Sequence, residues 1–172
     1  IPSMYATDHF SPDCNESRIC ELLATTAGIE VLVELRKIDQ SALSSSARID
    51  YLKVLEKQSS WLNAWMQEAI VIVAGSELSE PEGIYQYPDD MEREDIAAAL
   101  RLAPQTAQSR IDVARTLTKH LPQVCSALAT GEISAAHATM IAKEVEPLIS
   151  RNLPQSTISK IEEVAISYAE FH

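Results

Sequence analysis

The sequence has little glycine and no long hydrophobic run. Four glycines and eight prolines among 172 residues are too few turn formers for a turn-rich β protein. No stretch reaches the ~18 consecutive apolar residues that a membrane-spanning helix needs. Apolar residues still make up 46% of the chain, enough to form a substantial core. The composition therefore favours a folded helical protein that does not span a membrane.

Cysteine is also scarce, and its three positions form no CxxC pair. Cys14, Cys20 and Cys125 are an odd number, which argues against a disulfide scaffold and against a structural zinc site. The N-terminal residues lack a basic segment followed by an apolar run, so they show no secretory signal. We therefore expect reduced thiols in a cytoplasmic protein.

Acidic residues outnumber basic ones, and the excess lies mainly in the first half. Residues 1–90 hold 15 acids and 6 bases, a net charge of −9, whereas residues 91–172 hold 10 acids and 8 bases, a net charge of −2. Residues 101–119 contain four basic residues and one acidic residue. Since a formal charge of −11 repels phosphates, any contact with DNA must use this short basic segment.

The strongest periodic pattern predicts one long helix over residues 45–74. Its apolar and small residues are separated alternately by three and four positions, which is an a/d heptad track. We expect this track to form a dimer or partner face. Its larger members are Leu52, Leu55, Leu62, Met66 and Val73.

Proline, glycine and serine then predict the ends of shorter helices. We expect helices over residues 92–102 and from Pro104 to about His120, a third from Pro122 that Gly131 closes, and a fourth capped by Ser134. Pro147 should end that fourth helix, and a last one should begin near Pro154.

These patterns predict an all-α protein with four segments. We expect a loose leader over 1–15, a helical pair over 16–75, an acidic linker over 76–91, and a compact cluster of short helices over 92–172. In the helical pair, a helix over about 16–38 precedes the heptad helix. We expect the chain to continue beyond residue 172, because a helical pattern runs to the last residue.

Residues 94–115 have the pattern of a helix-turn-helix. A small residue is needed where the two helices touch, and Ala97 supplies it. Arg101 stands at the turn position that usually requires glycine because its φ is positive. A residue other than glycine can adopt that φ at a cost of about 1 kcal/mol, and a different turn is the alternative. Two short helices packed as a hairpin would give the same spacing. The apolar residues of the pair are Ile96, Leu100, Leu102, Ala107 and Ile111.

The second helix of this pair begins with short polar side chains that suit contact with base edges in a major groove. Candidate base contacts are Gln105, Thr106, Gln108 and Ser109. Candidate phosphate contacts are the four bases of the segment, because phosphate contacts supply most non-specific affinity. These bases are Arg101, Arg110, Arg115 and Lys119.

The sequence order extends this resemblance downstream. An "LP" helix at residues 121–130 is followed by a "GEIS" segment and a helix that contains His137. The region is similar to the DNA-binding part of ParB-type partition proteins. Residues 93–146 more closely resemble the actinobacterial 13E12 repeat family, a domain of unknown function, and the likeness extends over about 49–165.

The 13E12 resemblance implies a parent protein with an HNH endonuclease module after this domain. A divalent metal would belong to that module, whose clustered His and Asn side chains are missing here. The four histidines, among them His137, are scattered. We therefore expect no cofactor, no metal site, no small-molecule substrate and no catalytic residue in this chain.

The remaining candidates have simpler interpretations. His137 could be a ligand, but its place in the first turn of a helix favours packing and hydrogen bonding. Trp61 and Trp65 could anchor a partner, and we favour their burial in the bundle. No phosphate-binding loop, nucleophile elbow or HExxH pattern occurs in the sequence.

Two functions remain open. The first is a DNA-recognition module of an HNH-type protein, with double-stranded DNA as its partner and pairing through the heptad helix to match a palindromic site. The second is a helical protein-interaction or dimerisation module without DNA contact. A DNA binder must gather its bases on one exposed face, whereas an interaction module should expose an apolar strip along residues 52–73.

Overall fold

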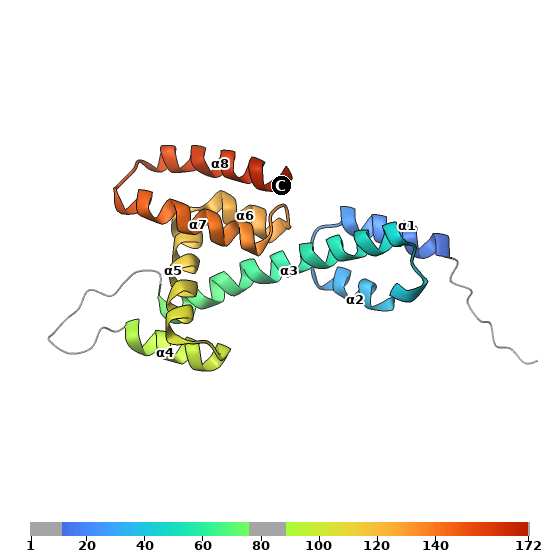
Figure 1. Ribbon diagram of the computed structural model, residues 1–172, viewed down its shortest axis with the longest axis horizontal. Helices are drawn as coiled ribbons and strands as arrows, with labels where there is room; N and C mark the ends of the chain where they lie inside the picture. The colour runs from blue at the N-terminus through green and yellow to red at the C-terminus, as the bar shows by residue number, and fades with distance from the viewer. Residues whose placement is uncertain (1–11, 76–88, 172) are drawn as a thin grey trace, which may run out of the picture. The chain divides into compact units, whose positions relative to one another are not determined.

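The computed structural model describes residues 12–75 and 89–171, and these residues contain α-helices, one short 3-10 helix and no strand (Figure 1). The prediction of an all-α protein is confirmed. The chain forms two compact units that divide between Gln58 and Ser59, inside helix α3 (Ser45–Ala74). The sequence predicted the bounds of α3 correctly, but the division between units does not fall in the expected linker, which lies almost entirely outside the described residues.

The first unit contains α1 (Pro12–Ala24), α2 (Ile29–Lys37), the 3-10 helix η1 (Gln40–Ala42) and the first part of α3. The expectation of one helix over 16–38 is wrong, because the chain leaves the helical path between Ala24 and Ile29. Of the predicted leader over 1–15, only residues from Pro12 are described, and these begin α1. Ile19, Leu35 and Val54 form the fully buried centre of this unit.

Two adjacent side chains of α3 hold the ends of α1 and α2. The Lys57 ammonium donates to the carbonyl oxygens of Leu23 and Thr25, at 3.2 and 2.9 Å. The buried Gln58 side chain accepts from the backbone N–H of Gly28, immediately before α2, at 2.8 Å. A cation at a helix C-terminus and an acceptor at an N-terminus both match the helix dipole. These bonds therefore fix the turn that breaks the expected single helix.

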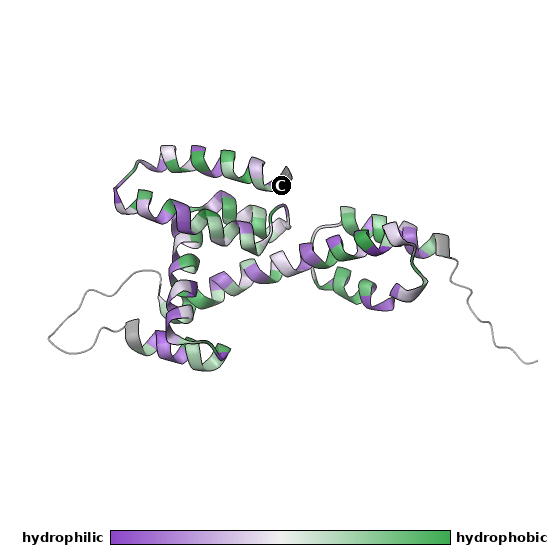
Figure 2. Cartoon of the chain, viewed as in Figure 1, coloured by the Kyte–Doolittle hydropathy of each residue, from purple (hydrophilic) through white to green (hydrophobic). Residues whose placement is uncertain are grey.

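The second unit contains the rest of α3, then α4 (Asp89–Leu100), α5 (Pro104–His120), α6 (Pro122–Thr130), α7 (Ala135–Ser150) and α8 (Gln155–Phe171). Helices α6, α7 and α8 pack against one another, and α5 packs against α4, α6 and α7. Figure 2 shows apolar (green) and polar (purple) residues on the same helices, as expected where each helix buries one face. The larger core joins the end of α5 to α6, α7 and α8 through Leu117, Leu121, Leu128 and Ile158.

Local caps fall where the sequence predicted them, with one exception. Gly131 has φ 77° and closes α6, and the Ser134 hydroxyl accepts from the backbone N–H of His137 at the start of α7. Pro147 does not end α7, which continues to Ser150. Pro147 has no N–H to donate to the carbonyl four residues earlier, so α7 lacks one hydrogen bond there. Only the last turn of α7 follows Pro147.

The start of α6 is capped by a distant acid. Glu162 of α8 is completely buried, and its Oε1 accepts from the backbone N–H groups of Gln123 and Val124 at 2.9 and 3.2 Å. Burial raises the pKa of the Glu162 carboxyl, and these two hydrogen bonds partly oppose the rise. Just before α6, at the C-terminal end of α5, the Gln155 side chain donates to the carbonyl of His120 at 3.1 Å.

The cysteines Cys14, Cys20 and Cys125 are not joined by disulfides. Burial is the main reason that the pKa of the Cys125 thiol is raised, and the charge of Glu68 adds to the effect. None of the helices in the described ranges combines the length and the apolar content that crossing a bilayer demands.

Candidate functional site

The turn between α4 and α5 has the positive φ of the first of the two alternatives that the sequence left open. Arg101 has φ 54°, in the left-handed region, and the N–H of Leu102 bonds to the carbonyl of Ala97 at 2.8 Å. This is the closure that usually employs glycine. Ala97 is buried where the two helices meet, together with Ile96, Ala107 and Ile111. Helices α4 and α5 thus form a tight pair joined by three residues.

Only part of the predicted base-reading face is exposed. Gln105 and Thr106 in the first turn of α5 are exposed, and Ser109 is half-buried. Gln108 is also half-buried, and its amide donates to the carboxylate of Asp112 on the next turn at 2.9 Å. Two of the four candidates therefore face solvent freely.

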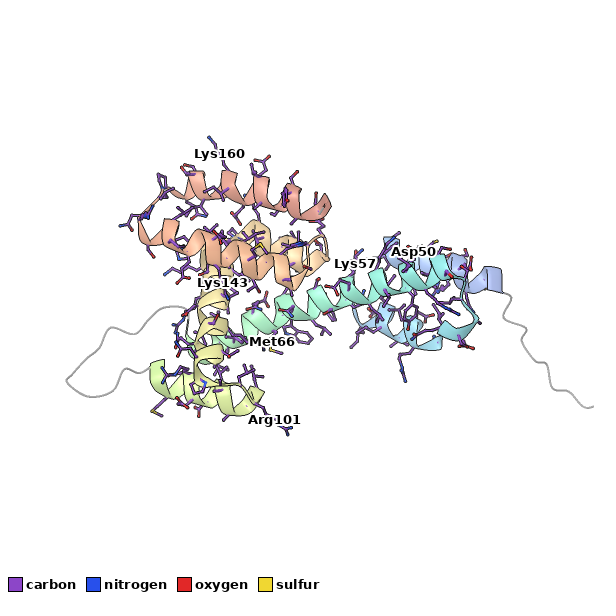
Figure 3. All side chains as sticks on the ribbon, in the orientation of Figure 1. Asp50, Lys57, Met66, Arg101, Lys143 and Lys160 are labelled. Carbon is purple, nitrogen blue, oxygen red and sulfur yellow. The ribbon has the colours of Figure 1, made fainter. Side chains whose placement is uncertain are left out.

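Arg101 and Arg110 are exposed, as their predicted contact with phosphates requires. Arg101 extends outward from the turn (Figure 3). Lys119 is exposed too, but it follows Arg110 by nine residues. At ~100° per residue, this spacing puts the two side chains on opposite sides of α5. The basic segment therefore does not form one ridge.

Arg115 has a different role from the one predicted. It is only 9% exposed, and its Nε and Nη2 atoms donate to the carbonyl oxygens of Gly75 and Ala74 at 3.0 and 2.7 Å. The guanidinium thus caps the C-terminus of α3, where the helix dipole favours a cation. Arg115 is removed from the set of phosphate contacts for this reason.

A groove lies between α3, α5 and α7, beside the exposed start of α5, and has a volume of about 830 Å³. Arg110 and Lys143 are the charged side chains among its described lining, which contains no carboxylate. Asp112 and Glu146 line an adjoining recess of about 200 Å³ that also contacts Lys143. The polar residues of the groove are Ser59, Asn63, Gln67, Thr106, Ser109 and Thr139.

Sequence reasoning missed Lys143 as a partner of Arg110. The two residues are 33 positions apart and belong to different helices. Nothing in the local pattern of α7 distinguishes Lys143 from any other exposed lysine, because only the packing of α7 against α5 brings it to the groove. Figure 3 labels Lys143 on α7 and Met66 on α3, two of the helices that form the groove.

The a/d track of α3 is exposed within the chain. In the second unit Leu62, Met66 and Val73 are 45%, 42% and 56% exposed, and in the first unit Leu52 and Leu55 are exposed as well. The buried face of α3 instead consists of residues one or two positions away. These are Ala47, Tyr51, Val54, Gln58, Ser60, Ala64, Gln67, Ile70 and Ala74.

Two further large apolar side chains flank the track in the second unit. Trp65 is 60% exposed and Ile72 is 83% exposed, so the expected burial of the tryptophans is wrong for Trp65. Trp61 is half-buried, and its ring lies 5.9 Å from that of Trp65. We call Leu62, Trp65, Met66, Ile72 and Val73 the α3 strip.

His137 lies in the first turn of α7, and its backbone N–H is the donor to the Ser134 cap. It is half-buried and lines an apolar groove between α7 and α8. Across residues 12–75 and 89–171, no three His, Cys, Asp or Glu side chains come together in a way that could hold a metal ion.

Residues 51–169 match the model of a protein family described as "Domain of unknown function (DUF222)". The match covers more than half of the chain and includes all of the second unit up to Ala169. The chain is therefore a member of the DUF222 family. Comparisons with curated proteins and with solved structures found no match.

Proposed function

We propose that this domain is a helical protein-interaction module that pairs through the α3 strip with a second copy of the chain. The exposure of the strip carries the proposal. Five large apolar side chains on three turns of one helix form a contiguous patch, whereas singly scattered apolar residues would need no explanation. Trp and Met are also residue types that are enriched in the cores of interfaces.

The spacing of the strip favours another helix as the partner. A track repeating every 3.5 residues meets an equivalent track when two helices supercoil, and a copy of α3 supplies that equivalent track. The residues around it are almost uncharged, because Glu68 is the one charged residue between Lys57 and Glu77. Pairing of two copies therefore brings few like charges together, despite the acidity of the chain.

Sedimentation equilibrium from micromolar to millimolar protein tests this proposal. We expect a dimer at the upper end of the range and a monomer after the double change Ile72→Glu and Val73→Glu. Both side chains are exposed, so the helical circular dichroism should be unchanged. Val33→Glu, at another exposed apolar position in the first unit, is the control and should leave the dimer intact. A constant monomer mass, or a dimer that survives the double change, contradicts the proposal.

Contact with double-stranded DNA is the second candidate. The observation that favours it is the exposed start of α5, where Gln105, Thr106 and Arg110 face solvent next to the exposed Arg101. Base edges and phosphates require such polar and cationic groups on one protruding helix end. Because Arg115 caps α3, it is no longer available as a phosphate contact, and DNA binding is therefore less well supported than pairing through the α3 strip.

Fluorescence anisotropy with a labelled duplex at low and high salt tests the second candidate. We expect saturable binding that weakens steeply with salt and is abolished by Arg110→Glu. Arg151→Glu removes an exposed cation at the far end of α7 and should have no effect. Absence of saturable binding at low salt, or equal affinity of the Arg110→Glu variant, excludes DNA contact by α5.

The likeness of residues 93–146 to the 13E12 repeat family suggests how either proposed function, pairing or DNA contact, would serve a longer parent protein. We propose that an HNH nuclease follows residue 172, and that this domain pairs or directs it. The coding sequence downstream of His172 tests this proposal, because an HNH module requires clustered His and Asn residues with a divalent metal. A downstream sequence without such a cluster contradicts it.

A further inference from the structure

The lining of the groove between α3, α5 and α7 is positively charged, although the carboxylates of Asp112 and Glu146 border it in the adjoining recess. The chain has a formal charge of −11, yet the described lining of this groove contains Arg110 and Lys143 and no carboxylate. The two cations come from different helices, α5 and α7, and both are exposed. An anionic group that enters the groove therefore meets positive charge from two sides.

A buried amide in the groove has an unused acceptor. Gln67 is 8% exposed, and its Nε2 donates to Oδ1 of Asn63 at 3.0 Å. Its Oε1 is also buried and has no hydrogen-bond partner. A buried acceptor left unpaired is costly, so a ligand N–H or O–H donor that meets Oε1 when the Gln67 side chain turns toward the groove gains a hydrogen bond there. This acceptor is independent of the two cations.

The groove also provides adaptable apolar contacts. Leu62 and Met66 of α3 and Met140 of α7 line it, and all three are exposed. Methionine side chains are flexible and polarizable, and they are common on surfaces that bind apolar side chains of varied shape. An occupant should therefore combine anionic groups, a hydrogen-bond donor and apolar side chains.

From this combination we infer that the groove binds an acidic peptide segment with apolar anchor residues. The backbone N–H of a peptide supplies the donor for Gln67, and its carboxylates pair with Arg110 and Lys143. A single-stranded nucleic acid fits less well, because none of the described lining residues is aromatic and such strands bind by stacking their bases on aromatic rings. A duplex is excluded as an occupant, since recognition of its grooves requires a protruding element rather than a concave site.

Phage display of random peptides on the full chain tests this inference. We expect the enriched peptides to share Asp or Glu next to Leu or Met. Synthesised with a fluorescein label, they should lose about tenfold or more in affinity for the double variant Arg110→Glu and Lys143→Glu. Arg151→Glu with Lys160→Glu changes the net charge equally at exposed positions outside this groove and should preserve binding.

A third variant tests the buried amide. Gln67→Leu removes the unpaired acceptor, so the free chain should unfold at the same or a higher temperature while peptide affinity falls several-fold. Affinity for the peptides that is equal in all variants, or enrichment without a shared acidic position, overturns the inference. A labelled oligothymidylate that binds saturably, displaces the peptides and depends on Arg110 would instead assign the groove to single-stranded nucleic acid.

The groove shares Leu62 and Met66 with the α3 strip, so a bound peptide and a second copy of the chain would compete for these two side chains. Ile72 and Val73 do not line the groove, so the double change that tests pairing should leave peptide binding intact. Conversely, the Arg110 and Lys143 changes should leave the dimer intact. The two proposals can therefore fail separately.

Discussion

The Nη2 atom of Arg115 lies 2.7 Å from the main-chain oxygen of Ala74, 41 positions earlier in the chain. Together with the bond from Nε to the oxygen of Gly75, this contact joins the middle of α5 to the end of α3. A side chain whose charge favoured contact with phosphates therefore completes a helix terminus inside the second unit.

Replacing Arg115 with Met should destabilise the protein. The change keeps most of the apolar stem but leaves two carbonyls at the end of α3 without their donor, at a cost of ~2–3 kcal/mol. Urea denaturation measures the loss as a lower midpoint. Arg110→Met is the matched control on the same helix, and because Arg110 is exposed its midpoint should stay near that of the parent. Equal midpoints for the two variants would show that the cap contributes nothing.

Glu162→Ala should also destabilise the protein, by ~1–2 kcal/mol, because the first turn of α6 loses its acceptor. Glu162→Gln keeps an acceptor oxygen and removes the buried charge. We therefore expect the glutamine variant to be at least as stable as the parent at neutral pH. Thermal unfolding of the three proteins at one pH checks this order, which a glutamine variant as unstable as the alanine variant would refute.

The buried Glu162 carboxyl also predicts that the stability of the protein depends on pH. Because burial raises the folded-state pKa of Glu162 above its value in the unfolded chain, protonation of Glu162 favours folding at acid pH, and this contribution is lost as the pH rises through the raised pKa. The parent should therefore gain stability relative to Glu162→Gln as the pH is lowered from neutral. Denaturation curves for both proteins at matched pH values measure the difference. A constant difference across that range would show that the carboxyl titrates normally.

For Asp39, in the first unit, we expect the opposite pH dependence of stability. Hydrogen bonds from the hydroxyl and the backbone N–H of Ser41 lower the pKa of Asp39, whose carboxylate caps η1. Its contribution to stability is therefore present at neutral pH and is lost as the pH falls through the lowered pKa. The parent should be more stable than Asp39→Asn near neutrality, and the difference should vanish in acid. NMR titration of the Asp39 carboxyl gives a direct check, and a pKa at or above the ordinary value would contradict the prediction.

Arg101→Gly should stabilise the protein by about 1 kcal/mol, because glycine adopts φ 54° without the clash that an L side chain makes. Asn152→Gly is the matched control. It has nearly the same φ, 55°, but asparagine already tolerates this conformation, so its gain should be smaller. Chemical denaturation ranks the two variants. A glycine at residue 101 that lowers stability would mean that the arginine side chain makes a compensating contact.

The sequence predicted the elements whose ends are set by local chemistry. The bounds of α3 and α5 were predicted correctly, and Gly131 and Ser134 close and open helices because their own backbone or side chain satisfies the terminus. Termini that are satisfied from a distance could not be predicted. Lys57 and Gln58 fix the break between α1 and α2, and no pattern around residue 28 records that contact.

The candidate site shows the same division. The contact at Ala97 follows from a local motif and was predicted, and the same motif gave the positive φ at Arg101 as one of two alternatives. Periodicity alone could not tell which stripe of α3 is buried, because the stripe through Val54 and the stripe through Leu55 lie about 100° apart on the same helix. Only the packing of the other helices selects the first stripe and leaves the second exposed.

Because the acceptor for the start of α6 is carried by α8, the integrity of the second unit depends on its last helix. A protease that cleaves near Pro154 would separate Glu162 from Gln123 and Val124 and would strip Ile158 from the core at the same time. Shortened versions of the domain that stop after α7 should accordingly be poor folders, and fragments designed for expression should retain the chain through Phe171.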